Sequence, residues 1–225
     1  EVTMEEQLRV LERCKEIVRD ALSKQASFHR ASVVLRENGR KQSISGPEGK
    51  VLTLVVVETD EWMAEKAARY HFGADITVVK NSSGQVHIFT NNKANLDLDD
   101  LAQALKIAEQ QAEGEVVVTD WLALRGEGIG YPGDKWYYSK KSHAQLHNGT
   151  EHHSDLNVTL LSLENILDLI KMSLDTQHFE YDDCQPKNCS GNRCDIFCYG
   201  FKRCREVRGR KYAENMQENP ADKSS

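Results

Sequence analysis

Hydrophobic residues recur at helical spacing near the start of the chain, with charged residues between them. The spacing predicts a helix over residues 5–24 with one apolar face. Its stripe consists of Leu8, Leu11, Cys14, Ile17, Val18 and Leu22. Because Cys14 lies on this stripe, we interpret it as a buried, inert thiol.

A short continuous apolar run, "VLTLVVV", covers residues 51–57. It has the length of a strand and is apolar on both faces, which is typical of a strand inside a sheet. The stretch before it, Ser43 to Lys50, reads "SISGPEGK", and its Gly-Pro pair predicts a turn.

Two further segments predict a helix and a hairpin. Thr59 or Asp60 is suited to cap a helix that ends at Gly73 and carries Met63, Ala64, Ala67 and Ala68 toward the core. Residues 74–80 and 85–91 flank "NSSG", a hairpin signature in which Gly84 takes a positive φ. In the second strand Val86, Ile88 and Thr90 face one way, and His87 and Phe89 face the other.

The next stretch predicts a second helix followed by a strand. Its stripe consists of Leu98, Leu101, Ala102, Leu105 and Ala108, Gly114 ends it, and "EVVVT" at 115–119 follows as a strand. The resulting β-α-β-β-α-β order predicts an α/β (or α+β) fold, in which helices pack on a mixed sheet.

Beyond residue 120 we expect a strand at 136–139 and an amphipathic helix that Ser162 caps, with Leu163, Ile166, Leu167, Ile170 and Leu174 on one side. We divide the chain into an N-terminal helix (1–26), an α/β domain (27–178), a cysteine-rich basic segment (179–212) and a disordered tail (213–225).

Composition narrows the class of protein. Hydrophobic residues make up 39% of the chain and charged residues 28%, as in an ordinary globular protein, and the net charge of −6 means that any basic site is local. No apolar run reaches the roughly 20 residues of a membrane span, and the acidic N-terminus has no signal-peptide core. We therefore expect a cytoplasmic protein without membrane contact.

Five of the six cysteines lie close together, with the spacing C-x4-C-x4-C-x3-C-x5-C, at Cys184, Cys189, Cys194, Cys198 and Cys204. Four thiolates hold a structural zinc ion, and an iron–sulfur cluster takes the same ligands. The segment is too polar to build an apolar core, so we favour a metal, zinc ahead of iron–sulfur, over disulfides or unligated thiols. Which four cysteines would bind is open, and His178 is a reserve ligand.

A basic stretch overlaps this cluster and contains Lys202, Arg203, Arg205, Arg208 and Arg210. Phe197, Tyr199 and Phe201 lie beside it. Cations that neutralise phosphates and aromatic rings that stack on bases indicate contact with single-stranded nucleic acid. The alternative is a solvated charge run with its aromatic rings packed around the metal.

Two loops carry further candidate chemistry. His143, His147, His152 and His153 lie near Asp155, which raises a catalytic metal as an alternative to plain exposed histidines. The glycine-rich "RGEGIG" at 125–130 allows backbone amides to approach a phosphate. Our candidate substrate-binding residues are Arg125, Gly126, Gly128, Lys140 and Lys141, and Lys135 is a further possible anion contact.

Residues 51 to about 109 resemble the substrate-binding C-terminal domain of DHH-family phosphoesterases, which include single-strand-specific exonucleases and nano-RNases. The resemblance rests on a strand, the helix "ETDEWMAEKAARYHFGAD", the hairpin "ITVVKNSSGQVHIFTNN" and the helix start "LDLDDLAQAL". It covers about a quarter of the chain and implies a phosphate-bearing substrate.

The chain also departs from that family. The Asp-His-His motif that holds the family's divalent metals does not occur, and "HHSD" at 152–155 lies in the wrong half of the chain. "RGEGIG" stands where the family has a Gly-Gly-Gly-His loop. We therefore expect the substrate-binding portion of a phosphoesterase or nuclease, a hydrolase only if a catalytic lobe exists elsewhere. The alternatives are a non-enzymatic, zinc-containing nucleic-acid-binding or scaffold protein, and a self-contained metallohydrolase that uses the histidine loop.

Overall fold

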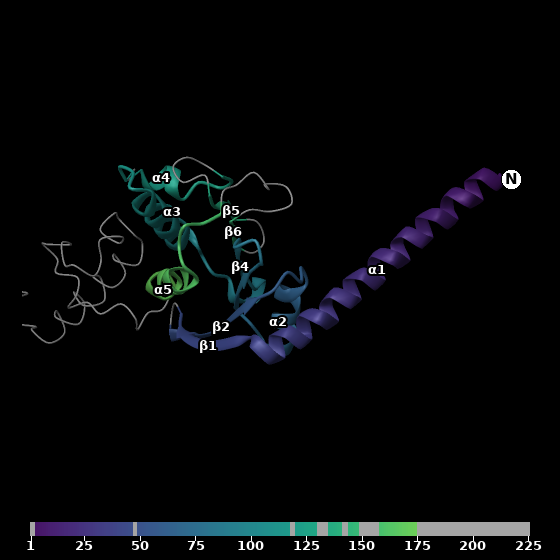
Figure 1. The fold of residues 1–225 in the computed structure, drawn as a ribbon, viewed down its shortest axis with the longest axis horizontal. Coiled ribbons are helices and arrows are strands. Elements are labelled where there is room, and N and C mark those ends of the chain that lie inside the picture. Colours follow the sequence, from purple (N-terminus) through teal and green to yellow (C-terminus); the bar gives the residue numbers. More distant parts are fainter. Residues whose placement is uncertain are drawn as a thin grey trace, which may run out of the picture.

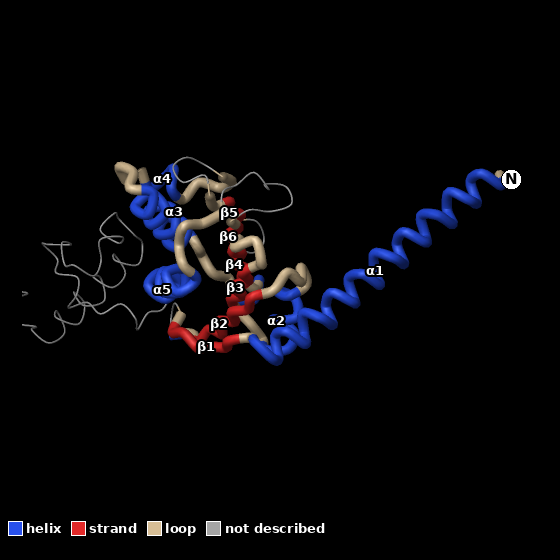
Figure 2. Tube along the Cα trace, viewed as in Figure 1, coloured by secondary structure: helices blue, strands red, loops and turns tan. Residues whose placement is uncertain are grey.

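A computed structural model describes residues 3–46, 49–117, 120–129, 135–140, 144–148 and 158–174. Its centre is a mixed sheet with helices on both faces, which confirms the predicted α/β class. In Figures 1 and 2 the strands form a column, with α3 and α5 on one side and α2 and the end of α1 on the other. No helix of the described residues is both long enough and apolar enough to cross a membrane.

Among the described residues, the sheet has six strands in the order β1-β2-β3-β4-β6-β5. Only β2 and β3 run parallel, and every other neighbouring pair is antiparallel. The strands are β1 (Arg40–Ser45), β2 (Val51–Glu58), β3 (Ile76–Lys80), β4 (Val86–Thr90), β5 (Tyr137–Ser139) and β6 (Gln145–His147).

Side chains of β2 alternate between two cores, because successive residues of a strand point to opposite faces. Leu52, Leu54 and Val56 pack under α3 (Asp99–Glu113) and α5 (Leu163–Leu174). Val55 and Val57 pack under α2 (Ala64–Phe72). Both faces of β2 are therefore covered from Leu54 to Val57, as the apolar run predicts, whereas Val51 at its start is 69% exposed.

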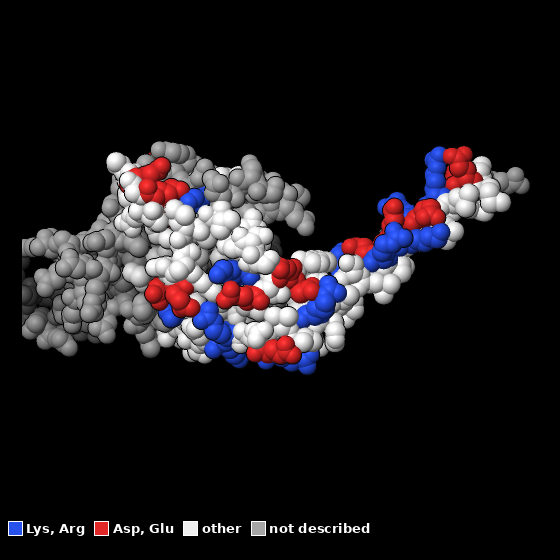
Figure 3. Space-filling view, in the orientation of Figure 1, with Lys and Arg blue, Asp and Glu red and all other residues white. Residues whose placement is uncertain are grey.

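The helix α1 is longer and more exposed than the sequence pattern predicts. It runs without a break from Met4 to Asn38, and only its last part packs on the body, through Ser27, Ala31, Ser32 and Leu35. The predicted boundary after residue 26 falls inside it. The whole predicted apolar stripe is exposed, Leu22 by 65% for example, and Cys14 is exposed too, so its burial is a wrong prediction. In Figures 1 and 3 the N-terminal portion of α1 projects from the body.

Contacts with the loop before α2 hold α1 in place. The carboxylate of Glu61 accepts a hydrogen bond from Ser27 Oγ at 2.9 Å and pairs with Arg30. These contacts hold the pKa of Glu61 below its usual value, with the Arg30 hydrogen bond as the main cause. His71 of α2 also lies 2.9 Å from Ser32 Oγ, measured from Nε2.

Turns and helix ends follow the sequence in several places. Gly73, Gly84 and Gly114 all have positive φ, as their predicted cap and hairpin roles require. The hydroxyl of Ser162 accepts a hydrogen bond from the Asn165 amide at 3.1 Å and so caps α5.

Three local predictions are wrong. Residues 43–45 belong to the edge strand β1, whose one buried side chain is Ile44, and the turn begins only at Gly46. Neither Thr59 nor Asp60 caps α2, because the helix begins at Ala64 and Asp60 Oδ1 accepts from the Ser82 amide instead. Residues 115–117 form no strand, and Val116 is 92% exposed.

The short helix α4 (Trp121–Leu124) and the strand β5 follow α3. The observed order from β2 onward is thus β-α-β-β-α, then α4, and only then the next strand. The predicted strand at 136–139 is confirmed as β5, although Trp136 itself precedes it.

Candidate functional site

A cleft at one end of β4 brings together residues from four parts of the chain. We call it the Lys140 cleft, and its volume is about 300 Å³. This volume lies at the lower limit of the range for small-molecule sites. Its walls are Thr90, Asn91, Asn92, Asn95, Leu96, Asp97, Asp99, Tyr138, Lys140 and Ala144.

Three side chains in this cleft form a hydrogen-bonded group. Asp99, in the first turn of α3, accepts from the Tyr138 hydroxyl at 3.0 Å and pairs with Lys140 Nζ at 2.7 Å. The Lys140 ammonium also lies 5.2 Å from the centre of the Tyr138 ring. Burial, followed by the charge of Asp99, raises the pKa of Tyr138, so its hydroxyl keeps its proton and remains a donor.

Asparagine residues also line the cleft. Asn91 caps the short 3₁₀ helix η2 (Asn92–Ala94) by accepting from the Lys93 amide at 3.1 Å. Asn95 ends that helix with φ of 48°, a conformation that asparagine tolerates better than most residues. As a result, Asn92 and Asn95 are exposed on the cleft side. They offer amide groups that both donate and accept hydrogen bonds.

The structure gives most of the glycine-rich loop a structural role. Arg125 is 5% exposed, donates to Gln103 at 2.8 Å and pairs with Asp100 at 2.9 Å. The amide of Gly126 donates to Ala123 O, and Gly128 exchanges two backbone hydrogen bonds with Tyr138. Arg125 and both glycine amides are thus engaged within the protein. Of the predicted anion contacts, Lys140 lines the Lys140 cleft, and Lys141 lies outside the described residues.

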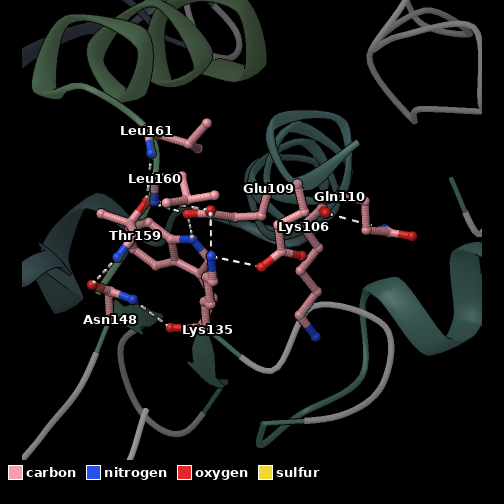
Figure 4. A network of polar contacts seen from close by, with 10 residues as sticks. Lys106, Glu109, Gln110, Lys135, Asn148, Thr159, Leu160 and Leu161 are labelled. Carbon is pink, nitrogen blue, oxygen red and sulfur yellow. Dashed lines mark hydrogen bonds and ion pairs between the residues drawn. The ribbon is translucent and has the colours of Figure 1, made fainter. Parts of the chain in front are cut away.

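A polar network connects α3 to the segment that follows it (Figure 4). The buried carboxylate of Glu109 accepts from Trp136 Nε1 and the Leu160 amide, each at 3.1 Å, and from the Thr159 hydroxyl. Lys135 lies between Glu109, at 3.7 Å, and Glu113, at 2.6 Å. Lys135, predicted as a possible anion contact, is therefore already paired.

Lys106 differs from the other buried cations of the described residues, which are Arg125 and Lys135. Its ammonium group is fully buried and has no hydrogen-bond partner. Figure 4 shows its side chain pointing away from the Glu109–Lys135 pair. Burial, and secondarily the charge of Lys140, lowers the pKa of Lys106 from 10.5 to about 8.

A second cavity, which we call the histidine groove, lies beside α2, where the parallel strands β2 and β3 end. Its volume is about 420 Å³. Such a position is a common binding place in α/β folds. Its walls are Thr59, Asp60, Glu61, Trp62, Ala64, Glu65, Val79, Asn81, Gln85, His87, Phe89 and His147.

His87 and His147 face each other across β4 and β6, with their Nδ1 atoms 3.1 Å apart. One ring must donate this hydrogen bond and the other accept it, so the two facing Nδ1 atoms carry one proton between them. Burial lowers the pKa of His87, which favours the neutral ring. Phe89 packs edge-to-face on His147, with ring centres 5.1 Å apart, so the wall is aromatic.

Of the four histidines named from the sequence, the structure describes His147. His147 pairs with His87, while His143, His152, His153 and Asp155 lie outside the described residues. Among the residues that are described, no group of three or more His, Cys, Asp or Glu side chains could hold a metal ion. All five clustered cysteines and the basic residues from Lys202 to Arg210 also lie outside the description, so the zinc and nucleic-acid predictions stay predictions.

Sequence reasoning missed most of the Lys140 cleft. The string "NNKAN" at 91–95 follows a strand and precedes a helix. Three asparagines in one such loop could have pointed to a binding site, because binding residues are often found on loops. Asp99 and Tyr138 gave none, because 39 residues separate them and the Tyr138–Asp99 hydrogen bond exists only in the folded chain.

No protein-family model matches the chain, and a search of curated proteins found no significantly similar sequence.

Proposed function

We propose that the chain is the substrate-binding portion of a DHH-like phosphoesterase or nuclease that acts on a phosphate-bearing substrate, with single-stranded nucleic acid as the candidate substrate. In this proposal the Lys140 cleft receives the substrate. Hydrolysis requires metal ions held by a catalytic lobe, as the resemblance implies.

One observation carries the proposal. The resemblance places the substrate loop at "RGEGIG", and Gly128 of this loop is bridged to Tyr138, a wall of the cleft. A loop chosen from sequence and a cavity found in the fold are therefore adjacent. Around the cavity, the Lys140 ammonium provides a cation, and Asn92 and Asn95 provide neutral hydrogen-bonding groups for a sugar or base.

The charge of the cleft limits what it can bind. Asp97 and Asp99 share it with Lys140, so the lining is not strongly basic. A phosphate at Lys140 competes with Asp99, which is 2.7 Å from the ammonium. We therefore expect one phosphate group to be held through a few directed contacts, with the rest of the substrate on neutral groups.

The test is binding of a pentanucleotide of single-stranded DNA with and without a 5′-phosphate, followed by fluorescence anisotropy. The variants are Lys140→Ala and Asn92→Ala, and the control is Lys66→Ala, which removes an exposed lysine from α2. We expect Lys140→Ala to weaken binding of the phosphorylated strand about tenfold, the usual scale for one charged hydrogen bond. Equal affinity of the unaltered protein for both strands would contradict the proposal.

The histidine groove supports a second candidate, a non-enzymatic nucleic-acid-binding protein. Trp62, 58% exposed, and Phe89 offer faces on which bases stack, and the carboxylates of the groove disfavour phosphate. In this case Trp62→Ala and Phe89→Ala weaken binding of both strands alike, while Lys140→Ala changes neither. The same anisotropy experiment thus separates the two candidates.

A further inference from the structure

The projecting part of α1, residues 4–24, concentrates exposed apolar side chains. Half of the large hydrophobic residues that are exposed in the described chain lie here, namely Met4, Leu8, Val10, Leu11, Ile17, Val18 and Leu22. They recur at helical spacing and form one broad apolar face, while α1 packs on the body only through its last part. An amphipathic helix gains most of its stability by packing such a face on a partner.

The surface of this helix has the shape that a second helix requires. A hollow of about 470 Å³ lies on it, lined by Cys14, Lys15, Val18, Arg19 and Leu22. Four of these residues, from Lys15 to Leu22, are spaced i, i+3, i+4 and i+7. Four residues at this spacing enclose one side chain of a facing helix in a coiled coil. The hollow therefore indicates a helix as the occupant of the apolar face.

The charges of the projecting part are distributed unevenly along its length. Residues 4–12 carry three acidic and one basic side chain, whereas residues 13–24 carry two acidic and four basic ones. The segment as a whole is neutral, so it lacks the basic excess that attracts a helix to an anionic membrane. Its two halves are instead complementary to each other. A second copy running in the opposite direction places an acidic half beside a basic half at both ends, and a parallel copy places like charges together.

The position of the body also favours opposite directions. The body lies at one end of the projecting helix (Figure 1). Packed helices are only about 8–10 Å apart, so two parallel copies would bring their bodies against each other at the same end. Antiparallel copies keep the two bodies at opposite ends of the pair.

We propose that residues 4–24 of α1 form an antiparallel pair with the same residues of a second copy of this chain. The contact is then symmetric, with the two-fold axis near Cys14, in the middle of the segment. Gln7 and Ala21 lie seven residues before and after Cys14, on the same side of the helix. In the pair, Gln7 of each copy therefore lies beside Ala21 of the other. This inference is independent of the proposed function.

The size of the contact sets its expected strength. Residues 4–24 span about 30 Å at the rise of an α-helix. Two helices of this length bury roughly 1,000 Å² in total, which is the lower limit for a specific interface. We therefore expect a dissociation constant of about 10–100 µM. In dilute solution the chain is monomeric, and the apolar face is exposed.

Sedimentation velocity of the full chain, from about 1 µM to about 300 µM, brackets this range. A reducing agent prevents disulfides from contributing. We expect the mass to rise toward that of a dimer. Leu11→Glu and Val18→Glu should weaken the association at least tenfold, since each places a charge in the contact. Ser23→Glu adds the same charge on the other side of the helix and should associate like the unaltered protein.

Three results would overturn the inference. One is a monomer at every concentration that sediments with phosphatidylcholine vesicles, which would assign the apolar face to a membrane surface. Another is a monomer in which Leu11→Glu speeds the hydrogen exchange of residues 8–24, which would mean that a segment of the same chain outside the described residues covers the face. The third is equal association of Leu11→Glu and Ser23→Glu.

Cross-linking tests the direction of the pair. Gln7→Cys and Ala21→Cys, each combined with Cys14→Ser, are mixed, mildly oxidised and mapped by peptide mass spectrometry, which separates these positions from the other cysteines. An antiparallel pair forms disulfides between the two variants. Disulfides that join each variant only to itself would show a parallel pair and contradict the inference.

Discussion

The two long helices α1 and α3 invert the usual distribution of residues. The first half of α1 exposes apolar side chains, with Leu8, Leu11 and Val18 about half exposed or more. In contrast, α3 buries polar ones, including Gln103, Lys106 and Glu109 at 0% exposure. The difference shows that position in the fold, and not residue type, decides which side chains lose contact with water.

Both helices are amphipathic by sequence, yet only α3 has neighbours on every side. The sheet and α5 cover its apolar face. Its polar face is satisfied by Arg125, Lys135, Trp136, Tyr138, Lys140, Thr159 and Leu160. On α1 the charged residues pair with one another along the helix, for example Arg9 with Glu5 and Lys24 with Asp20. Figure 3 shows these charges alternating along the projecting helix. Such exposed pairs contribute little to stability.

The largest expected difference between the two helices is in local stability. Amides of α3 should exchange with solvent only through global unfolding, whereas those of residues 8–24 should exchange through fraying, with opening free energies several kcal/mol lower. Hydrogen exchange followed by mass spectrometry measures this. Strong protection of residues 8–24 would mean that this part of α1 is covered by a partner, and the difference from α3 would disappear.

The next largest effect concerns the centre of the buried network. Glu109→Ala leaves Trp136 Nε1, the Leu160 amide and one side of Lys135 without their acceptor. We expect the free energy of unfolding to fall by about 3–5 kcal/mol, measured by urea denaturation. Glu16→Ala, on the exposed part of α1, is the control and should change it by less than about 0.5 kcal/mol. A loss below 1 kcal/mol at Glu109, about what an ordinary neutral hydrogen bond contributes, would show that the network is loosely held.

An opposite and smaller effect is expected at Lys106. The pKa of this lysine falls from 10.5 to about 8 on folding, so the folded protein binds fewer protons than the unfolded chain between these two values. Stability should therefore increase as the pH rises from 8 to 10.5, and the penalty is fully present below pH 8. Lys106→Met should raise stability at pH 7 by up to about 3 kcal/mol.

The same substitution should also remove the Lys106 contribution to this pH dependence. Urea denaturation at several pH values, with Lys66→Met as the matched exposed control, measures both quantities. A steeper pH dependence in Lys106→Met than in the unaltered protein would contradict the assignment.

The smallest effect is expected on the exposed face of α1. Leu11→Glu and Val18→Glu place charges where water already has access, so the stability of the body should change by less than about 0.5 kcal/mol. Ser23→Glu adds the same charge on the other side of the helix and serves as the control. If either apolar substitution destabilises the protein strongly while Ser23→Glu does not, the apolar face has a partner.

Local periodicity was sufficient to predict β2, β3, β4, α2, α3 and α5 within a few residues. Such strands and helices can be predicted because their buried apolar residues recur at every second position in a strand and at every third or fourth position in a helix. The edge strand β1 was not predicted, because Ile44 is its one buried residue and so it shows no apolar alternation. The buried polar contacts of α3 could not be predicted, because Asp100 and Arg125 are 25 residues apart in the sequence, and Glu109 and Leu160 are 51 apart.

The sequence by itself determined the α/β class, the hairpin at Gly84 and the glycine helix ends, since these depend on neighbours a few residues away. Only the tertiary structure decided that Arg125 forms a buried ion pair with Asp100, that Lys140 lines a cleft and that the apolar stripe of α1 is exposed to solvent. The reason is physical. Backbone conformation and amphipathic spacing are local properties, whereas burial and pairing of a charge depend on which distant segment arrives next to it.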